Sequence, residues 1–467
     1  MSCHLTYTLN FSRFIILSCG VFMNEIKESL LALLTQQQLD TLSSDVCRRE
    51  GGGPLVVYGA AGTGKTLLVL KKLDQLHRTG RLDDQNRALY CCFWPGIRMV
   101  IKECQYQRGV AKWCISRDGE NLLSRTFYLI PGRKSNRNSK PWAYLAMWTL
   151  LVFTCRWAIF LRGNTKKYKH IFMDEAEAVC LSFHKSILSE TMTQVYRHYH
   201  DGNCDVEDCQ NASLDADLHV GDKIKRHCSK DWGELWFMID SNQAMILIPT
   251  YSPVDLRSPT FCLSQIMRST KSIFDVFKTF YNGPVPRPPV APSRLPNLSL
   301  GHAIQGPPVY WVSLTKDVDE TIADVIIDLC ATKGVKPNDI CVIPFLQSEK
   351  TSTSSINRHI GEYFVEKTFQ PTAVSDAETF LMQKQLNDFL VSWALKVKGL
   401  EFTVVIMPVE DEDFDIYDME DRRKAYVISS RCTCMLIFIC NDEVRSRMRI
   451  KDTSVEYPFN IKLDCKG

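Results

Sequence analysis

The sequence has little net charge for its length. Its 56 Lys and Arg residues nearly balance 53 Asp and Glu residues, which leaves a formal charge of +3 over 467 residues. This balance excludes a strong attraction of the whole chain to nucleic acid or to an acidic membrane, so binding of either kind would need a local groove. Length alone suggests about two or three domains, each able to bury a core.

The sequence also lacks the spacings of metal and disulfide frameworks. Its 19 Cys residues are an odd number and are scattered, often in apolar stretches, which predicts reduced thiols. The segment 198–228 is rich in His and Cys but has neither C-x-x-C nor H-x-x-x-H, so we favour a solvated loop over a zinc site. A zinc site there would use His198, His200, Cys204, Cys209, His219, His227 and Cys228.

The strongest positive signal is the stretch "LVVYGAAGTGKTLLVL" at residues 55–70. An apolar strand leads through a loop of the form G-x-x-x-x-G-K-[ST] into an apolar helix. The backbone N–H groups of such a loop cradle phosphates, Lys65 reaches the outer phosphates and the Thr66 hydroxyl binds Mg²⁺. The residues predicted to bind the nucleotide are Gly59, Ala60, Ala61, Gly62, Thr63, Gly64, Lys65 and Thr66. The loop predicts a ligand but no particular activity, because many enzyme classes use it.

Polar residues follow two further apolar strands. In "IFMDEAEA", Asp174 is predicted to hold Mg²⁺ through water and Glu175 to polarise the water that attacks the γ-phosphate. A helix N-terminus with stabilising acids is the alternative. In "IDSNQ", Asp240 and Gln243 end a strand where the amide can sense the γ-phosphate, although a simple turn would also explain them.

Strands alternate with helical patterns along the whole chain, which predicts an α/β fold with parallel sheets flanked by helices. Strands are expected to begin at Leu55, Arg87, Lys169 and Leu235 in a first domain, and at Asp339, Phe402 and Cys434 in a second domain. The helix after the phosphate loop is expected to reach Leu73. The expected division is an N-terminal apolar segment at 1–23, a first domain at 24–258 and a second at 259–467, with a proline-rich loop at 283–296.

Seven segments occur in an order that resembles superfamily 1 helicases, nearest to the UvrD/Rep type and to the helicase-like region of Schlafen proteins. They are "LTQQQLDTL", "GAAGTGKT", "DEAEA", "DSNQ", "LSQIMRSTKSI", "KVKGLEFTVVI" and "AYVISSRCTCMLIFI". The resemblance spans residues 34 to about 440. It implies two RecA-like P-loop domains with the ATP site in the cleft between them, ATP and Mg²⁺ as cofactors, and single-stranded DNA or RNA as a partner.

The resemblance also implies roles for single residues. Gln38 matches the glutamine that reads the adenine edge, and Glu401 matches a residue near the ribose, with Gly399 letting the backbone approach. Arg268 and Arg431 match the two arginines that the second domain directs at the γ-phosphate. An arginine in such a position is worth about 10³ to 10⁵ in rate.

Two departures from the family pattern affect the expected activity. Trp393 and Leu395 occupy positions where the family usually has the Thr and His that couple the bound nucleic-acid strand to the ATP site. Phe93 and Trp94, in a segment that usually contacts the strand, could stack on bases or belong to the core. The chain also leaves little room for large accessory domains, so nucleotide hydrolysis is expected more firmly than strand separation.

Two apolar runs raise the question of a membrane. The apolar run at residues 14–23 resembles that of a signal peptide, but Arg13 is the only positively charged residue before it and no A-x-A cleavage site follows it. Met23 is an alternative start of the chain. Residues 142–161 are broken by Arg156 and lie between two nucleotide-site motifs, so we expect a buried helix, with a membrane span as the alternative.

The sequence therefore predicts an ATP-dependent nucleic-acid helicase or translocase. One alternative is a nucleotide-gated ATPase switch that binds protein or RNA without unwinding, and another is a small-molecule P-loop phosphotransferase with a single α/β domain. Basic residues at 133–140 and 162–169 are candidate strand contacts or solvated loops. We expect an intracellular monomer in the nucleus or cytoplasm, and no protein partner is indicated.

Overall fold

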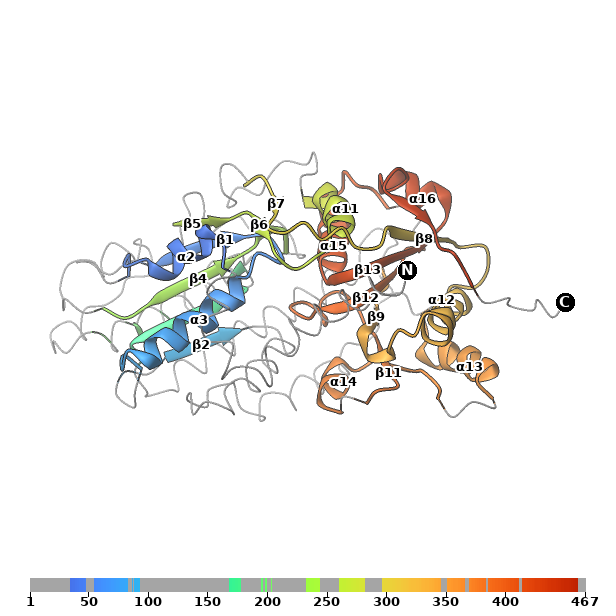
Figure 1. The fold of residues 1–467 in the computed structure, drawn as a ribbon, viewed down its shortest axis with the longest axis horizontal. Helices are drawn as coiled ribbons and strands as arrows, with labels where there is room; N and C mark the ends of the chain where they lie inside the picture. Colours follow the sequence, from blue (N-terminus) through green and yellow to red (C-terminus); the bar gives the residue numbers. More distant parts are fainter. Residues whose placement is uncertain are drawn as a thin grey trace, which may run out of the picture.

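The computed structural model shows two α/β domains side by side (Figure 1). It describes residues 34–47, 54–82, 86, 88–92, 168–177, 195, 198–199, 203, 232–243, 260–281, 296–345, 351–365, 369–383, 385–410 and 414–460. Each domain has a sheet of parallel strands flanked by helices, which confirms the expected fold class.

The first domain contains a five-stranded sheet in the order β2-β3-β4-β1-β5. Its strands are β1 (Leu55–Gly59), β2 (Ala88–Cys92), β3 (His170–Asp174), β4 (Leu235–Ile239) and β5 (Phe261–Leu263). Helices α2 (Gln36–Ser43) and α3 (Lys65–Arg78) pack on it around a core that includes Leu68, Leu73 and Trp236. Because β5 pairs with β1, the first sheet takes in residues beyond the expected boundary at 258.

The second domain contains a seven-stranded sheet in the order β10-β11-β9-β12-β13-β8-β14. Its strands are β8 (Val309–Ser313), β9 (Ile340–Val342), β10 (Thr372–Val374), β11 (Asp388–Val391), β12 (Phe402–Pro408), β13 (Cys432–Cys440) and β14 (Ser454–Glu456). Its helices are α11 (Lys271–Tyr281), α12 (Val318–Ile327), α13 (Thr353–Tyr363), α14 (Ala377–Gln383), α15 (Met419–Ser429) and α16 (Asp442–Arg447).

Both faces of the second sheet are buried, which explains the unbroken apolar sequence of β12. Val405 and Met407 belong to the core formed with α11 and α15, whereas Val404 and Ile406 belong to the core formed with α12 and α13. The two-residue period of a strand thus supplies both faces at once. This packing sets α15 and α11 near the first domain (Figure 1).

Short elements complete the fold. They are the short strands β6 (Gln265–Ile266) and β7 (Ser299–Leu300), the 3₁₀ turns η3 (Ser241–Gln243) and η5 (Pro337–Asp339), and the π turn η4 (Asp328–Thr332). The segment around β6 approaches the phosphate loop, because the N–H of Met267 donates to the carbonyl oxygen of Gly62 at 3.0 Å.

Several expectations need correction. Helix α3 continues past Leu73 to Arg78, because Leu76 extends its buried face, and it ends where Gly80 takes a φ of +67°. Strand β13 begins at Cys432 rather than Cys434, and β9 begins after Asp339. Seven strands escaped the sequence analysis, namely β5, β6, β7, β8, β10, β11 and β14.

Other expectations fall on residues that the structure does not describe. These are the segment 1–23, Phe93 and Trp94, the apolar run 142–161, the basic residues 133–140, most of 162–169, most of the proposed zinc ligands, and the proline-rich loop up to residue 295. The cysteines whose side chains are described are free thiols: Cys47, Cys262, Cys330, Cys341, Cys432, Cys434 and Cys440. No helix among the described residues has the length and apolarity to cross a membrane.

Candidate functional site

The phosphate-loop segment joins β1 to the N-terminus of α3. Gly62 and Gly64 have φ values of +80° and +83°, which side chains disfavour, and a Cβ at Gly64 would lie 2.5 Å from Nε2 of Gln38. Lys65 is the first residue of α3, and its ammonium donates to the carbonyl oxygens of Gly59 (2.9 Å) and Ala60 (3.2 Å). Because the first N–H groups of a helix have no acceptor within the helix, this end of α3 suits an anion.

Asp174 ends β3 and accepts hydrogen bonds on both carboxylate oxygens. The hydroxyls of Thr66 (2.6 Å) and Tyr90 (2.8 Å) donate to Oδ2, and the N–H of Glu175 donates to Oδ1 (3.0 Å). Burial and the neighbouring Glu175 raise the pKa of Asp174, whereas the two hydroxyl groups oppose that rise. The structure thus brings together Thr66 and Asp174, the two residues predicted to hold Mg²⁺.

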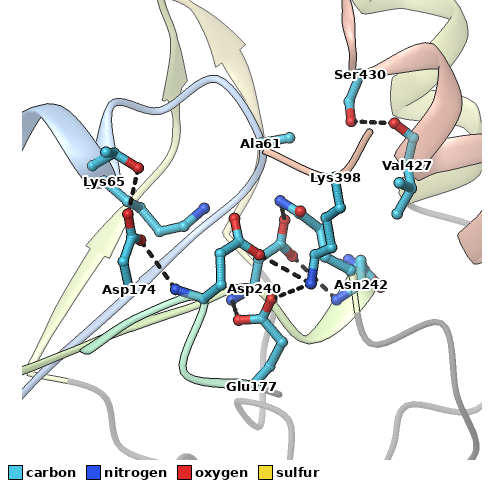
Figure 2. A network of polar contacts seen from close by, with 12 residues as sticks. Ala61, Lys65, Asp174, Glu177, Asp240, Asn242, Lys398, Val427 and Ser430 are labelled. Atoms are coloured by element: carbon cyan, nitrogen blue, oxygen red, sulfur yellow. Dashed lines mark hydrogen bonds and ion pairs between the residues drawn. The ribbon is translucent and has the colours of Figure 1, made fainter. Parts of the chain in front are cut away.

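Lys398 reaches from the second domain to the two glutamates that follow β3 (Figure 2). Its Nζ lies 2.7 Å from Oε1 of Glu177 and 3.0 Å from Oε2 of Glu175, and all three side chains are buried. Burial by itself raises the pKa of Glu175, but the Lys398 ammonium, a hydrogen bond with Glu177 and the charges of Lys65 and Arg431 together outweigh burial and hold that pKa well below its usual range. Burial raises the pKa of Glu177. Glu175 has a φ of +54°, a strained conformation that is common at functional sites.

Asp240 follows β4 and lies at the centre of a second group of contacts. Its Oδ2 accepts hydrogen bonds from Nε2 of Gln243 (3.0 Å) and from the hydroxyl of Tyr426 in α15 (2.8 Å). Its backbone N–H donates to Oε2 of Glu177 at 3.2 Å, which joins this group to the Lys398 contacts (Figure 2). The Tyr426 hydroxyl also accepts the N–H of Ala61 at 2.7 Å.

The two arginines predicted to contact the γ-phosphate lie close to the boundary between the two domains. Arg268 forms an ion pair with Glu401, and both side chains are partly exposed. Arg431 is buried, and its guanidinium donates to the carbonyl oxygen of Val427 (3.1 Å) and to the hydroxyl of Ser430 (2.9 Å). Burial and then Arg268 lower the pKa of Arg431. Gly399, which precedes Glu401 in the same loop, has a φ of +83°.

Gln38 braces the phosphate loop from α2. Its Oε1 accepts the N–H of Thr35 (2.9 Å) and its Nε2 donates to the carbonyl oxygen of Thr63 (2.8 Å). The first bond completes a capping box at the start of α2. A base that Gln38 reads would therefore have to use the remaining hydrogen-bonding capacity of its amide.

Four residues of this site were missed by sequence reasoning: Tyr90, Glu177, Lys398 and Tyr426. Glu177, Lys398 and Tyr426 lie inside the motif segments "DEAEA", "KVKGLEF" and "AYVISSR", so the segments themselves were the available signal. Tyr90 lies on the neighbouring strand of the sheet, where β2 pairs with β3.

The site suits a phosphate group with a divalent cation. Thr66 and Asp174 offer the oxygen atoms that Mg²⁺ prefers. Oε1 of Gln243, a buried oxygen of this site, has no hydrogen-bond partner among the described residues, and such an atom normally binds water or a ligand. Within the part of the chain that the structure describes, no three His, Cys, Asp or Glu side chains are grouped to hold a metal by themselves.

Comparisons with known proteins give limited similarity. No family model matches the chain, and no curated protein matches it. The C-terminal domain of a possible DNA helicase from Lactobacillus plantarum is similar at 13% identity and a TM-score of 0.28, over 41% of this chain and 98% of that one. The arterivirus nonstructural protein 10 helicase, solved with DNA, is similar at 11% identity and a TM-score of 0.33, over 88% of this chain and 65% of that one. Because both TM-scores are low, the assignment of the site depends on its geometry.

Proposed function

We propose that the chain is an ATP-dependent helicase or translocase that hydrolyses ATP at this site and acts on single-stranded DNA or RNA. The observation that carries the proposal is that both domains build one polar site. Lys398 contacts Glu175 and Glu177, and Tyr426 contacts Asp240 and the N–H of Ala61. A nucleotide bound there would join the two domains, and its hydrolysis would release them, which is how a motor grips a strand alternately.

Each predicted residue has a role in this proposal. The loop and Lys65 bind the phosphates, Thr66 and Asp174 hold Mg²⁺, and Glu175 activates the attacking water. Mg²⁺, when bound, would neutralise charge that develops on the phosphate oxygens. The residues proposed to sense or stabilise the γ-phosphate are Gln243, Arg268 and Arg431, and those proposed near the base and ribose are Gln38, Gly399 and Glu401.

A nucleotide-gated switch that binds protein or RNA without translocating is a second candidate, because Trp393 and Leu395 replace the residues expected to couple the strand to the ATP site. A phosphotransferase with one α/β domain is not supported, since the chain has a second sheet of seven strands. We also propose that the protein acts as a monomer in the nucleus or cytoplasm.

The test is an ATPase assay on the full chain with and without single-stranded DNA or RNA. Lys65→Ala and Glu175→Gln are the test variants, and Arg78→Ala, at the exposed end of the same helix as Lys65, is the control. We expect hydrolysis by the wild type and Arg78→Ala to rise severalfold with a strand, and both test variants to lose it.

Two other outcomes are informative. A Lys65-dependent hydrolysis that responds to neither DNA nor RNA would favour the switch over the motor. Equal hydrolysis by the wild type and both test variants would show that the proposed site is wrong.

A further inference from the structure

A continuous series of hydrogen bonds connects the phosphate loop to Gln243 through the second domain. The N–H of Ala61 donates to the hydroxyl of Tyr426 (2.7 Å), and that hydroxyl donates to Oδ2 of Asp240 (2.8 Å). Nε2 of Gln243 donates to the same Oδ2 (3.0 Å). The series therefore starts after β1, passes through α15 and ends after β4.

The direction of each bond in this series follows from the chemistry of its groups. A backbone N–H can only donate and an ionised carboxylate can only accept. The hydroxyl of Tyr426 must therefore accept from Ala61 and direct its single hydrogen at Asp240. Burial and the nearby Asp240 raise the pKa of Tyr426, so the hydroxyl keeps that hydrogen.

The ring of Tyr426 is held firmly in its place. It is completely buried and packs against Phe277 (6.0 Å between ring centroids) and Tyr281 (5.7 Å) of α11. A ring packed in this way moves with α15 and α11, so the position of its hydroxyl reports the position of the second domain.

Gln243 is only partly satisfied at the far end of the series. Its side chain is 2% exposed, and its Oε1 has no hydrogen-bond partner among the described residues. Because Nε2 is bound to Asp240, the orientation of the whole amide, and hence of Oε1, depends on where Asp240 lies. A ligand group next to Oε1 would meet an acceptor whose direction is fixed by this series.

We propose that Tyr426 is a positioning residue whose hydroxyl couples the position of the second domain to the orientation of Gln243 and to the phosphate loop. This inference rests on the proposed hydrolysis of a nucleotide at the site. If α15 moves away from the loop, both bonds of the hydroxyl break together, and Asp240 loses a donor that fixes it. The arrangement for hydrolysis is then complete only when the second domain is in place.

The test compares Tyr426→Phe with Tyr281→Phe in the full chain. Each variant removes one buried hydroxyl from the same aromatic cluster and keeps the ring, but only Tyr426 is part of the hydrogen-bond series. We expect Tyr426→Phe to lower kcat about tenfold with KM within about twofold of the wild type, which is the size of one hydrogen bond that acts on the transition state. Tyr281→Phe should keep the wild-type kcat.

Hydrogen exchange gives a readout that does not depend on activity. In Tyr426→Phe the Ala61 amide loses its hydrogen-bond acceptor, so the peptide that contains Ala61 should exchange its amide hydrogen faster than in the wild type. In Tyr281→Phe the same peptide should exchange at the wild-type rate. Asp240→Asn weakens the same series from its other side, so it should also lower kcat with little change in KM. The double variant Tyr426→Phe/Asp240→Asn should then be no slower than the slower single variant.

The outcomes separate this inference from the proposed function. If hydrolysis is absent or is independent of Lys65, the proposed function fails, and the exchange of Ala61 still tests the contact. If hydrolysis depends on Lys65 but Tyr426→Phe keeps a wild-type kcat, or changes KM alone, the inference about Tyr426 is wrong. Additive losses of kcat in the double variant would also overturn it.

Discussion

Replacing Lys398 with methionine should strongly destabilise the folded chain. The Lys398 side chain is 1% exposed, and those of Glu175 and Glu177 are 7% and 1% exposed. Methionine keeps most of the length of lysine but removes the ammonium, which leaves two buried carboxyl groups without their cation. Breaking a buried ion pair costs about 3–5 kcal/mol, so we expect the free energy of unfolding to fall by about 4 kcal/mol. That is a large share of the roughly 5–15 kcal/mol that stabilises a typical protein.

The matched control is a second substitution, Glu177→Gln. Lys398→Met leaves two buried carboxyl groups without their cation. The double variant Lys398→Met/Glu177→Gln replaces one of these carboxyl groups with a neutral amide. It should therefore regain about 1–3 kcal/mol relative to Lys398→Met, because the two positions interact directly.

Urea unfolding of the full chain, followed by tryptophan fluorescence and circular dichroism, measures these differences. Both signals are needed because two domains can unfold in separate transitions. A loss below about 1 kcal/mol for Lys398→Met would place that pair in the range of weak surface ion pairs and refute the reasoning. A double variant as unstable as Lys398→Met would refute it too.

Four further variants test three other features of the structure. His170 is buried, and burial lowers its pKa to about 4 in the folded chain. As the pH falls from about 6.5 to about 4, the unfolded chain binds a proton at His170 that the folded chain does not bind, so the free energy of unfolding should fall by about 3 kcal/mol. His170→Asn should make the free energy of unfolding less dependent on pH over this range. A Cβ at Gly233 would lie 1.7 Å from a backbone oxygen, so Gly233→Ala should lower the thermal midpoint and reduce the free energy of unfolding by about 3 kcal/mol. The control is Gly80→Ala, because a Cβ at Gly80 would meet nothing within 4 Å. Since Gly80 has a φ of +67°, Gly80→Ala should still reduce the free energy of unfolding by about 1 kcal/mol. The ion pair of Arg268 with Glu401 is partly exposed, so Arg268→Ala should leave the unfolding midpoint nearly unchanged while lowering kcat by about 10³ under the proposed function.

The positions of the first-domain residues of the candidate site could be predicted because they depend on local patterns in the sequence. Asp174 and Asp240 each follow a buried strand, and parallel strands bring their carboxyl ends to one edge. The glycines of the loop indicate positions with a positive φ, and Lys65 begins the helix that follows. These signals are contained within a few residues of each other, so one sequence shows them.

The contacts between the domains could not be predicted in the same way. Lys398 lies 221 residues from Glu177, and Tyr426 lies 365 residues from Ala61. Such pairs depend on how two sheets are placed, and no local periodicity reports that placement. The missed strands have a related cause: β14 and β10 lie at the edges of the second sheet and expose part of their residues, so they lack the continuous apolar run that revealed β12.

Lys398 and Arg431, both in the second domain, have different kinds of partner, and this difference favours a site that responds to phosphate. Lys398 already has two carboxylates of the first domain as partners. Arg431 instead donates to the neutral carbonyl and hydroxyl groups of its own domain, and burial makes its charge costly. Charge-assisted hydrogen bonds are about twice as strong as bonds between neutral groups, so a phosphate at this boundary would compete successfully for the Arg431 guanidinium. Under the proposed function, Lys398 and Tyr426 set the distance between the domains, and the arginines supply the charge that the nucleotide itself recruits.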